Sequence, residues 1–263
     1  MTTIETKFAI LVISSDGYAD IWPSFFYCLE KNWADCPFPI YLGSNTISFR
    51  GNSKISTVLS GPGLDWSTSL MKILDQINQE YLFVILEDFL IVSNVNTNLF
   101  LNHFKFMADE KINHMHFYSP VVPFDLKLND DYGIYSEGAP YRVNVFGFWN
   151  KNCLRSLLIK GENPWNFEIM GSYRSSGWNN FLSIINRPFD IINLVEKGKL
   201  IPASVKYCKE NKIDLLLHSR MTWSGKMSIK NLLQEKYFKY VSSISWRYRV
   251  KLMNILRKAL ITY

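Results

Sequence analysis

The order of apolar and polar residues predicts a chain of alternating strands and helices. An apolar run from Phe8 to Ile13 predicts a first buried strand. Apolar residues spaced by four follow it and predict an amphipathic helix with Pro23 near its first turn. A second amphipathic helix is predicted in residues 65–80, with Asp65 as its N-cap. The fold therefore opens with strands joined by helices.

The segment 81–92, "YLFVILEDFLIV", is predicted to be the next strand and places two acids, Glu87 and Asp88, between apolar runs. Because strand side chains alternate, the two carboxylates are expected to point to opposite faces, so that one reaches a cleft and the other braces the back. A buried carboxylate without a partner costs several kcal/mol, roughly, so a bound cation or a donor-rich ligand would compensate it. The alternative is that one acid caps a neighbouring helix and the other meets an arginine.

The rest of the chain continues the alternation. The predicted elements are a helix at 96–111, a strand at 112–119, a strand at 141–149, a helix at 150–161, a polar loop at 161–177, a hairpin or strand pair at 189–202 and a last strand at 213–223. This order predicts an α/β fold with a mostly parallel sheet covered on both faces, whose ligands bind at the carboxyl ends of the strands. Glu87 and Asp88 lie at such an end.

Composition limits the class of protein. With 263 residues and 48% hydrophobic content, the chain can bury the core of one large domain, and disorder is excluded for its bulk. The four cysteines have no metal-site spacing and are expected to be reduced thiols in the cytoplasm. The first apolar run is too short for a signal peptide or a membrane span. The 15% aromatic content suits a protein that stacks rings on bases or sugars.

The net charge of +6 is concentrated at the end of the chain. Residues 226–263 carry nine basic side chains and one acid, so this tail holds +8 and the remainder −2. Its basic residues alternate with large aliphatic and aromatic ones at helical spacing, which is typical of a helix in a membrane interface. We therefore expect a catalytic domain at 1–224 and basic amphipathic helices at 225–263. A packing helix and a nucleic-acid patch are the alternatives.

The segment 161–177 gathers the side chains that a sugar site needs. A Trp presents a flat face to a pyranose, a carboxylate accepts the proton of an attacking hydroxyl, and an Arg offsets charge on a leaving diphosphate. The residues of these types are Glu162, Trp165, Glu168, Tyr173 and Arg174. The alternative is a helix-start loop whose Trp is buried and whose ions pair with one another.

The histidines are weaker candidates. His114 and His116 share one face of a predicted strand and have the geometry of two metal ligands, but such pairs are more often core or surface residues. His218, at the end of the last predicted strand, is the better candidate for contact with a diphosphate or its cation.

Several ordered motifs resemble a sugar-nucleotide glycosyltransferase family of bacterial polysaccharide gene clusters, which has a GT-A type of fold. They are "ISSDGYADIWPSFF", "NWADCPFPIYLGSN", "YLFVILEDFLI", "YRVNVFGFWNKNCLRSLL" and "GENPWNFEIMGS", and they span about residues 8–200. One motif departs from the family pattern: Thr68 and Ser69 stand where an acid and an arginine are expected. A donor contact at those positions is therefore in question.

The resemblance implies roles for individual residues. Asp88 becomes the metal or diphosphate contact, with Glu87 as its brace, and Glu168 becomes the catalytic base. Ser15 and Asp16 meet the nucleoside. The cation is Mn²⁺ or Mg²⁺, although a metal-independent enzyme stays open in which the diphosphate is bound by basic side chains, namely Arg142, Arg174 or His218. Trp165 and Tyr173 are expected to contact the acceptor.

The expected activity is transfer of a sugar from a nucleotide sugar to a hydroxyl of a lipid-linked glycan, with inversion, in the synthesis of a bacterial lipopolysaccharide, O-antigen or capsule. The enzyme would sit at the inner face of the cell membrane through its tail. Two alternatives are a metal-dependent nucleic-acid enzyme and a non-catalytic glycan-binding protein. The donor sugar, the acceptor and the linkage do not follow from the sequence.

Overall fold

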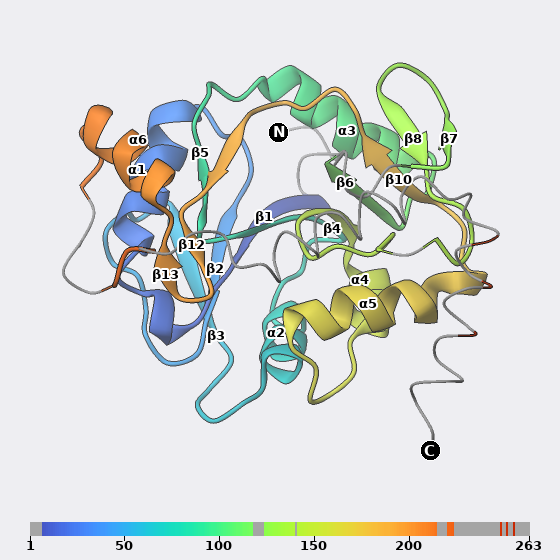
Figure 1. The fold of residues 1–263 in the computed structure, drawn as a ribbon, viewed down its shortest axis with the longest axis horizontal. Coiled ribbons are helices and arrows are strands. Elements are labelled where there is room, and N and C mark those ends of the chain that lie inside the picture. Colours follow the sequence, from blue (N-terminus) through green and yellow to red (C-terminus); the bar gives the residue numbers. More distant parts are fainter. Residues whose placement is uncertain are drawn as a thin grey trace.

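The computed structural model describes residues 7–117, 124–139, 141–214 and 220–223, with three single positions at 248, 251 and 255. Its strands and helices alternate along the chain (Figure 1). The strands are β1 (Phe8–Ile13), β2 (Ile40–Ser44), β3 (Ile55–Leu59), β4 (Tyr81–Leu86), β5 (Phe89–Ile91), β6 (His114–Phe117), β7 (Leu126–Lys127), β8 (Tyr132–Ile134), β9 (Gly147–Asn150), β10 (Phe181–Ile184), β11 (Ile191–Asn193), β12 (Val195–Glu196) and β13 (Lys199–Leu200). The helices are α1 (Trp22–Asn32), α2 (Trp66–Leu74), α3 (Thr97–Asp109), α4 (Lys151–Leu157), α5 (Pro164–Arg174) and α6 (Pro202–Glu210), with short 3-10 turns η2 (Asp16–Tyr18) and η3 (Ser175–Gly177).

Within the described residues, nine strands form one sheet in the order β3-β2-β1-β4-β9-β6-β10-β8-β7. Strands β3, β2, β1 and β4 are parallel neighbours, and β6 pairs in parallel with β10. Strand β9 runs antiparallel to both β4 and β6, and β8 runs antiparallel to β10. All strands of this sheet except β8 and β9 thus point the same way. The predicted α/β class with a mostly parallel sheet is confirmed.

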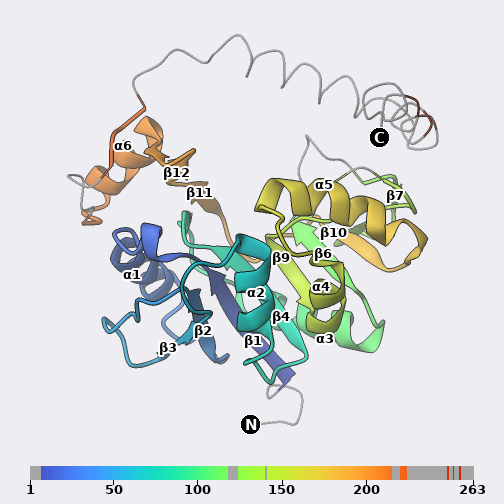
Figure 2. The same ribbon diagram turned by 90° about the horizontal axis from the view of Figure 1, so that it is seen from below.

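Helices cover both faces of the sheet, and β1 shows why. All six of its residues are buried, and their side chains alternate between two cores. Phe8 and Ile10 pack with the aromatic residues of α1 and α3, whereas Ala9 and Leu11 pack with α2, α4 and α5. Figure 2 shows α2, α4 and α5 together on one side of the sheet.

The predicted N-cap of the second helix is confirmed. The Asp65 carboxylate accepts hydrogen bonds from the Thr68 amide at 2.9 Å and from the Thr68 and Ser67 hydroxyls, both at 2.7 Å. The Ser69 hydroxyl donates to Ser60 at 2.6 Å. Thr68 and Ser69, which depart from the family pattern, therefore bond within the chain at the start of α2.

Three predicted elements were wrong in type or extent. The strand predicted at 141–149 begins only at Gly147, the first residue of β9. The segment 81–92 is two strands, β4 and β5, because the chain turns at Glu87 and Asp88. The polar loop predicted at 161–177 is mostly helix α5, because Asn163 caps it through a bond from the Asn166 amide at 2.9 Å and Pro164 fits its first turn. The mixture of apolar and polar residues on all sides of this helix had hidden its period.

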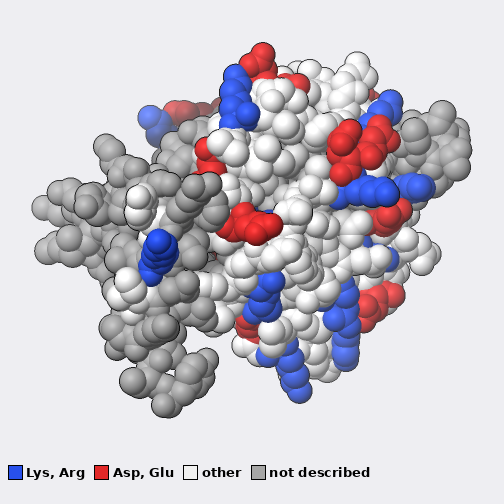
Figure 3. Space-filling model, turned by 90° about the vertical axis from the view of Figure 1, so that its right-hand side faces the viewer, with Lys and Arg blue, Asp and Glu red and all other residues white. Residues whose placement is uncertain are grey.

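Other sequence predictions concern segments that the structure describes only in part. His218 and the domain boundary at 224/225 lie outside the described residues, and so does the basic tail apart from the three single positions. Among the described residues, no helix is both long and apolar enough to span a membrane. Over the described part of the face in Figure 3, basic and acidic side chains are interspersed.

Candidate functional site

The candidate site lies where β1 and β4 end side by side. These strands pair in parallel up to Ile13 and Leu86, so the residues that follow both strands emerge at the same edge of the sheet. Ser14 and Ser15 follow β1, and the acidic pair Glu87–Asp88 follows β4. The fold therefore brings together two segments that are 73 positions apart along the sequence, as Ile13 and Leu86 show. This is the edge at which sheets of this class bind ligands.

The acidic turn holds one buried acid, Glu87, and one half-buried acid, Asp88. Glu87 is 6% exposed, and burial, together with the neighbouring charge of Asp88, raises its pKa well above the usual range against an opposing hydrogen bond with Ser14. Burial also raises the pKa of Asp88 to about 6, although the charge of Arg220 opposes the shift. Oδ1 of Asp88 is buried and has no hydrogen-bond partner in the described structure. The turn thus holds the Glu87 carboxyl, whose protonated form is favoured, beside an Asp88 oxygen that lacks a hydrogen-bond donor.

The expectation that the two acids point to opposite faces was wrong in its premise. Glu87 and Asp88 lie in a turn, where the alternation of a strand does not apply. Burial raises the pKa of Tyr18, and the charges of both Glu87 and Asp88 add to this shift. The charges of both carboxyl groups therefore influence the same side chain, that of Tyr18 in η2.

A cation that sequence reasoning missed completes this edge. Arg220 forms an ion pair with Asp20, with Nε 2.7 Å from Oδ2 and Nη2 2.8 Å from Oδ1. Its Nη2 also donates to the Gly17 carbonyl at 2.6 Å, and the guanidinium lies 4.3 Å from the centre of the Tyr18 ring. The sequence placed Arg220 near a strand end beside His218, but nothing in it indicated a partner 200 positions away.

Asp16 is committed to the neighbouring loop. Its carboxylate accepts hydrogen bonds from the amides of Asn45, Thr46 and Ile47 at 3.2, 2.9 and 3.0 Å and from the Thr46 hydroxyl at 2.5 Å. Desolvation acts to raise the pKa of Asp16, but these bonds outweigh it and lower the pKa. The carboxylate therefore fixes the loop after β2 to the end of β1. Contact of Asp16 or the half-buried Ser15 with a nucleoside stays a prediction.

Glu168 approaches the same edge from α5. Its Oε1 accepts a hydrogen bond from the Val145 amide at 3.2 Å. Val145 lies two residues before Gly147, the residue that pairs with Val84 of β4, so Glu168 is bound to the segment that leads into β9. Burial raises the pKa of Glu168 to about 7. A carboxyl with such a pKa is half ionised near neutral pH, which suits a general base.

The two arginines predicted to bind a diphosphate have partners within the chain. Arg142 is fully buried, donates to the carbonyls of Ser136 and Trp178 at 3.0 and 2.5 Å, and has its pKa lowered to about 10 by burial. Arg174 binds Glu162 through two bonds of 2.7 Å. This pair agrees with the alternative interpretation of paired ions. The donor-binding roles of both arginines stay predictions.

The aromatic residues of α5 differ from that alternative. Trp165 is 65% exposed rather than buried, in the first turn of the helix. Tyr173 is half-buried near the end of the helix. Acceptor binding by these two side chains stays a prediction, and the exposed indole ring of Trp165 has the surface that stacking on a sugar needs.

His114 and His116 belong to the core. His114 stacks on Trp149 with ring centres 3.8 Å apart and bonds to the Phe148 carbonyl at 2.9 Å, whereas His116 bonds to the Tyr135 hydroxyl. Burial lowers the pKa of both, that of His116 to about 3. The part of the chain that the structure describes contains no group of three His, Cys, Asp or Glu able to hold a metal ion.

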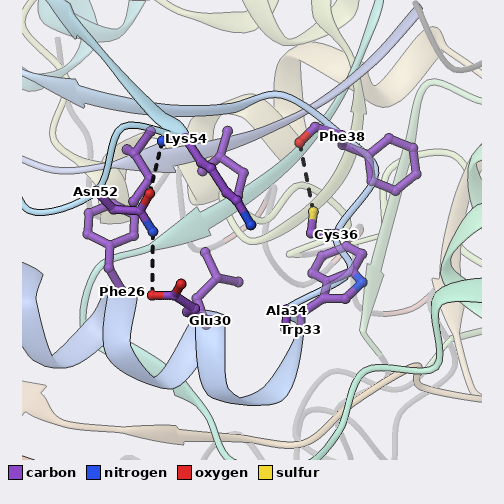
Figure 4. A pocket seen from close by; sticks show the side chains of 11 residues that line it. Phe26, Glu30, Trp33, Ala34, Cys36, Phe38, Asn52 and Lys54 are labelled. Carbon is purple, nitrogen blue, oxygen red and sulfur yellow. Dashed lines mark hydrogen bonds between the residues drawn. The ribbon is translucent and has the colours of Figure 1, made fainter.

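A cavity of about 260 Å³ lies away from this edge (Figure 4). It is bounded by α1 and by the first residues of β2 and β3, Ile40 and Ile55. Because β2 and β3 run parallel to β4, their first residues lie at the opposite end of the sheet from Glu87 and Asp88. This cavity is therefore separate from the candidate site.

A search of solved structures found matches to the fold of this chain. The S. aureus TarS fragment 1–349 in complex with UDP-GlcNAc matches with a TM-score of 0.50 and 13% identity over 74% of this chain. The chain has a GT-A-like fold. Two matches have lower TM-scores. Galactosyltransferase LgtC in complex with donor and acceptor sugar analogues matches with a TM-score of 0.37 and 10% identity over 92% of this chain and 99% of that one. CMP:2-keto-3-deoxy-manno-octonic acid synthetase in complex with CTP matches with a TM-score of 0.46 and 9% identity over 78% of this chain and 98% of that one.

The expected GT-A type of fold is thus confirmed. The chain spans 60% of the TarS fragment and 37% of the longer TarS structure. No protein-family model matches the sequence, and no curated protein matches it.

Proposed function

We propose that this chain is a glycosyltransferase that moves a sugar from a nucleotide sugar to an acceptor hydroxyl at the edge formed by β1, β4 and α5. The observation that carries the proposal is the acidic turn, in which Asp88 has an unsatisfied oxygen and Glu87 a raised pKa. Buried polar groups of this kind need a partner, and a phosphorylated sugar offers both hydroxyl donors and phosphate acceptors. The TarS fragment was solved in complex with UDP-GlcNAc, which supports this class of donor.

Glu168 acts as the general base in this proposal. Its carboxylate removes the proton of the acceptor hydroxyl while the hydroxyl oxygen forms a bond to the anomeric carbon. The bond from that carbon to the diphosphate oxygen breaks, and the nucleoside diphosphate leaves with the electron pair. Attack opposite to the leaving group inverts the anomeric configuration, so a product with retained configuration would remove Glu168 from this role.

The acidic turn recognises the donor. The raised pKa of Glu87 favours its protonated form, which donates a hydrogen bond to a phosphate or ribose oxygen. Oδ1 of Asp88 accepts a hydrogen bond from a hydroxyl group of the nucleotide sugar. In this proposal Ser15, which follows the end of β1, and its neighbour Asp16 contact the nucleoside.

A divalent cation fits this turn only with ligands from the donor. Asp88 offers one carboxylate oxygen, of the type that Mg²⁺ and Mn²⁺ bind, and the described residues hold no group of three metal ligands. Diphosphate oxygens and water would complete the coordination. Such a cation would offset the charge of the leaving group.

The acceptor in this proposal is a lipid-linked glycan of a bacterial surface polysaccharide. Exposed Trp165, on the same helix as Glu168, supports a sugar acceptor. The tail at 226–263, with its net charge of +8, supports contact with an anionic membrane. In a cosedimentation assay, the full chain should pellet together with phosphatidylglycerol vesicles. A variant with its tail lysines and arginines changed to glutamine should stay in the supernatant.

A thermal-shift screen tests the central part of the proposal. UDP, GDP, CDP and ADP would each be added with and without Mn²⁺. A ligand that binds the folded state at 100 times its Kd stabilises it by about 2.7 kcal/mol, which is several degrees for a chain of this size. We expect one nucleotide to raise the Tm in this way. No shift with any of the four would contradict the proposed function.

A further inference from the structure

The charge balance of the candidate site requires a cation. Asp20, Glu87 and Asp88 surround the end of β1 and β4, whereas a nucleoside diphosphate is itself an anion. Among the described residues, Arg220 is the cation whose charge acts on Tyr18, Glu87 and Asp88. A diphosphate that approaches the acidic turn therefore meets repulsion from the ionised carboxylates of Asp20 and Asp88 unless this guanidinium faces it.

The backbone that carries Arg220 is attached to the acidic turn. The Leu200 amide donates to the Met221 carbonyl at 3.0 Å, and the Trp223 amide donates to the Leu200 carbonyl at 2.9 Å. Leu200 belongs to the β12–β13 hairpin, which begins beside Leu194, and the Leu194 amide donates to the Asp88 carbonyl at 2.7 Å. Segment 220–223 and the acidic turn therefore belong to one hydrogen-bonded unit.

The guanidinium is held in one orientation. Asp20 binds its Nε and Nη2, the Gly17 carbonyl binds Nη2, and the Tyr18 ring lies against it. The Arg220 and Asp20 side chains are only 10% and 18% exposed, so water screens this pair weakly. An arginine fixed in this way loses little entropy when it binds an anion, and its planar fork matches phosphate oxygens.

Two buried polar atoms indicate that a ligand completes this unit. Oδ1 of Asp88 and Nε1 of Trp223 are both buried without a hydrogen-bond partner in the described structure. One is an acceptor and the other a donor, and they belong to the two segments that the β12–β13 hairpin joins. A hydroxyl group supplies the donor that the Asp88 oxygen lacks, and a phosphate oxygen supplies the acceptor that the Trp223 nitrogen lacks.

We infer that Arg220 binds the diphosphate of the sugar donor, that Asp20 and Tyr18 position it, and that segment 220–223 forms a wall of the donor site. The inference rests on the proposed function and names a residue that the sequence did not indicate. It assigns the diphosphate to Arg220 rather than to Arg142 or Arg174. Both terminal nitrogens of Arg142 and of Arg174 donate to other residues, whereas Nη1 of Arg220 makes no hydrogen bond with the described residues. The nucleoside of the donor is uncharged, so its binding does not depend on the guanidinium charge.

The test compares a nucleoside diphosphate with its nucleoside. Calorimetry would measure the Kd of UDP, GDP, CDP and ADP, and of uridine, guanosine, cytidine and adenosine, for the full chain. For the nucleotide that binds, Arg220→Gln should weaken the diphosphate at least tenfold and leave the nucleoside unchanged. The variant Asp20→Asn/Arg220→Gln, which leaves no unpaired charge, should show the same loss if the single variant folds poorly.

A matched control is available on α4. Arg155 binds Asp75 through Nε and Nη2 at 2.9 and 3.3 Å, in the same two-bond arrangement as Arg220 with Asp20. Arg155→Gln should leave the diphosphate Kd within twofold of the wild type. If both Arg220 variants bind the diphosphate as tightly as the wild type, the inference is overturned and the proposed function stands. If the wild type binds no nucleoside diphosphate, both are overturned.

Discussion

Replacing Glu168 by glutamine should make the stability of this protein less sensitive to pH. The buried carboxyl has its pKa raised from 4.5 to about 7 because ionisation inside the protein is unfavourable. A raised pKa means that the unfolded chain loses this proton at lower pH than the folded one. The stability contributed by the protonated form is therefore complete below pH 4.5 and is lost as the pH rises through 7. Glutamine keeps the acceptor for the Val145 amide but does not titrate.

The size of the effect follows from the shift. One pKa unit corresponds to about 1.4 kcal/mol, so the full shift corresponds to about 3 kcal/mol. Because Glu168 as a residue is only half-buried, solvent reduces this figure, and we expect about 1 to 3 kcal/mol. Relative to the wild type, Glu168→Gln should gain this much free energy of unfolding between pH 4.5 and pH 8.5.

Urea unfolding at both pH values would measure the difference. All other titrating groups are common to the two proteins and cancel in the comparison. The exposed acid Glu110 provides the control, since Glu110→Gln makes the same chemical change on the protein surface. If the difference between Glu168→Gln and the wild type is the same at both pH values, the carboxyl does not have a raised pKa. Glu168 would then lose the property that suits a base.

Three further outcomes are expected. Asp65→Ala should lower the free energy of unfolding at pH 7 by about 1 to 2 kcal/mol in urea titration, because the start of α2 loses its cap. Asp65→Asn should lower this free energy by less, because asparagine also caps helices. Because hydrogen bonds lower the pKa of Asp65, its contribution is present above pH 3.8 and should fade as the pH falls further. Gly147→Ala should cost about 2 to 4 kcal/mol, since its φ is +142° and a Cβ would lie 2.4 Å from the Met115 carbonyl; an equal Tm would contradict this packing. For sugar transfer, kcat/KM should rise with an apparent pKa near 7, and Glu168→Gln should abolish this limb of the profile.

The sequence predicted those parts of the fold that local patterns determine. The fully apolar β1, the period of α1 and the cap at Asp65 are each encoded within a few residues, and the structure agrees with all three. The division of 81–92 was not predictable in this way. The turn carries a buried and a half-buried acid, and it is held by the pairing of β11 with β5 and by the bond from Leu194 to the Asp88 carbonyl. Both partners lie more than a hundred positions away.

The candidate site was predictable in its residue types but not in its pairing. The acidic pair and Glu168 could be selected because carboxyls beside apolar runs are unusual. Which arginine accompanies them could not be deduced, because side-chain partners depend on the path of the chain. Arg142 and Arg174 stood in motifs and have partners elsewhere, whereas Arg220 reaches Asp20 across 200 positions.

The affinity of Asp88→Asn for a nucleoside diphosphate tests the central claim most directly. The substitution keeps the shape of the side chain and removes its charge, and Asp130→Asn, at an acid exposed beside Lys127, serves as the control. In the presence of Mn²⁺, the account predicts that Asp88→Asn changes the Kd of the nucleotide selected by the screen at least tenfold, while Asp130→Asn leaves it unchanged. Equal affinities for both variants and the wild type would show that the acidic turn does not face the donor.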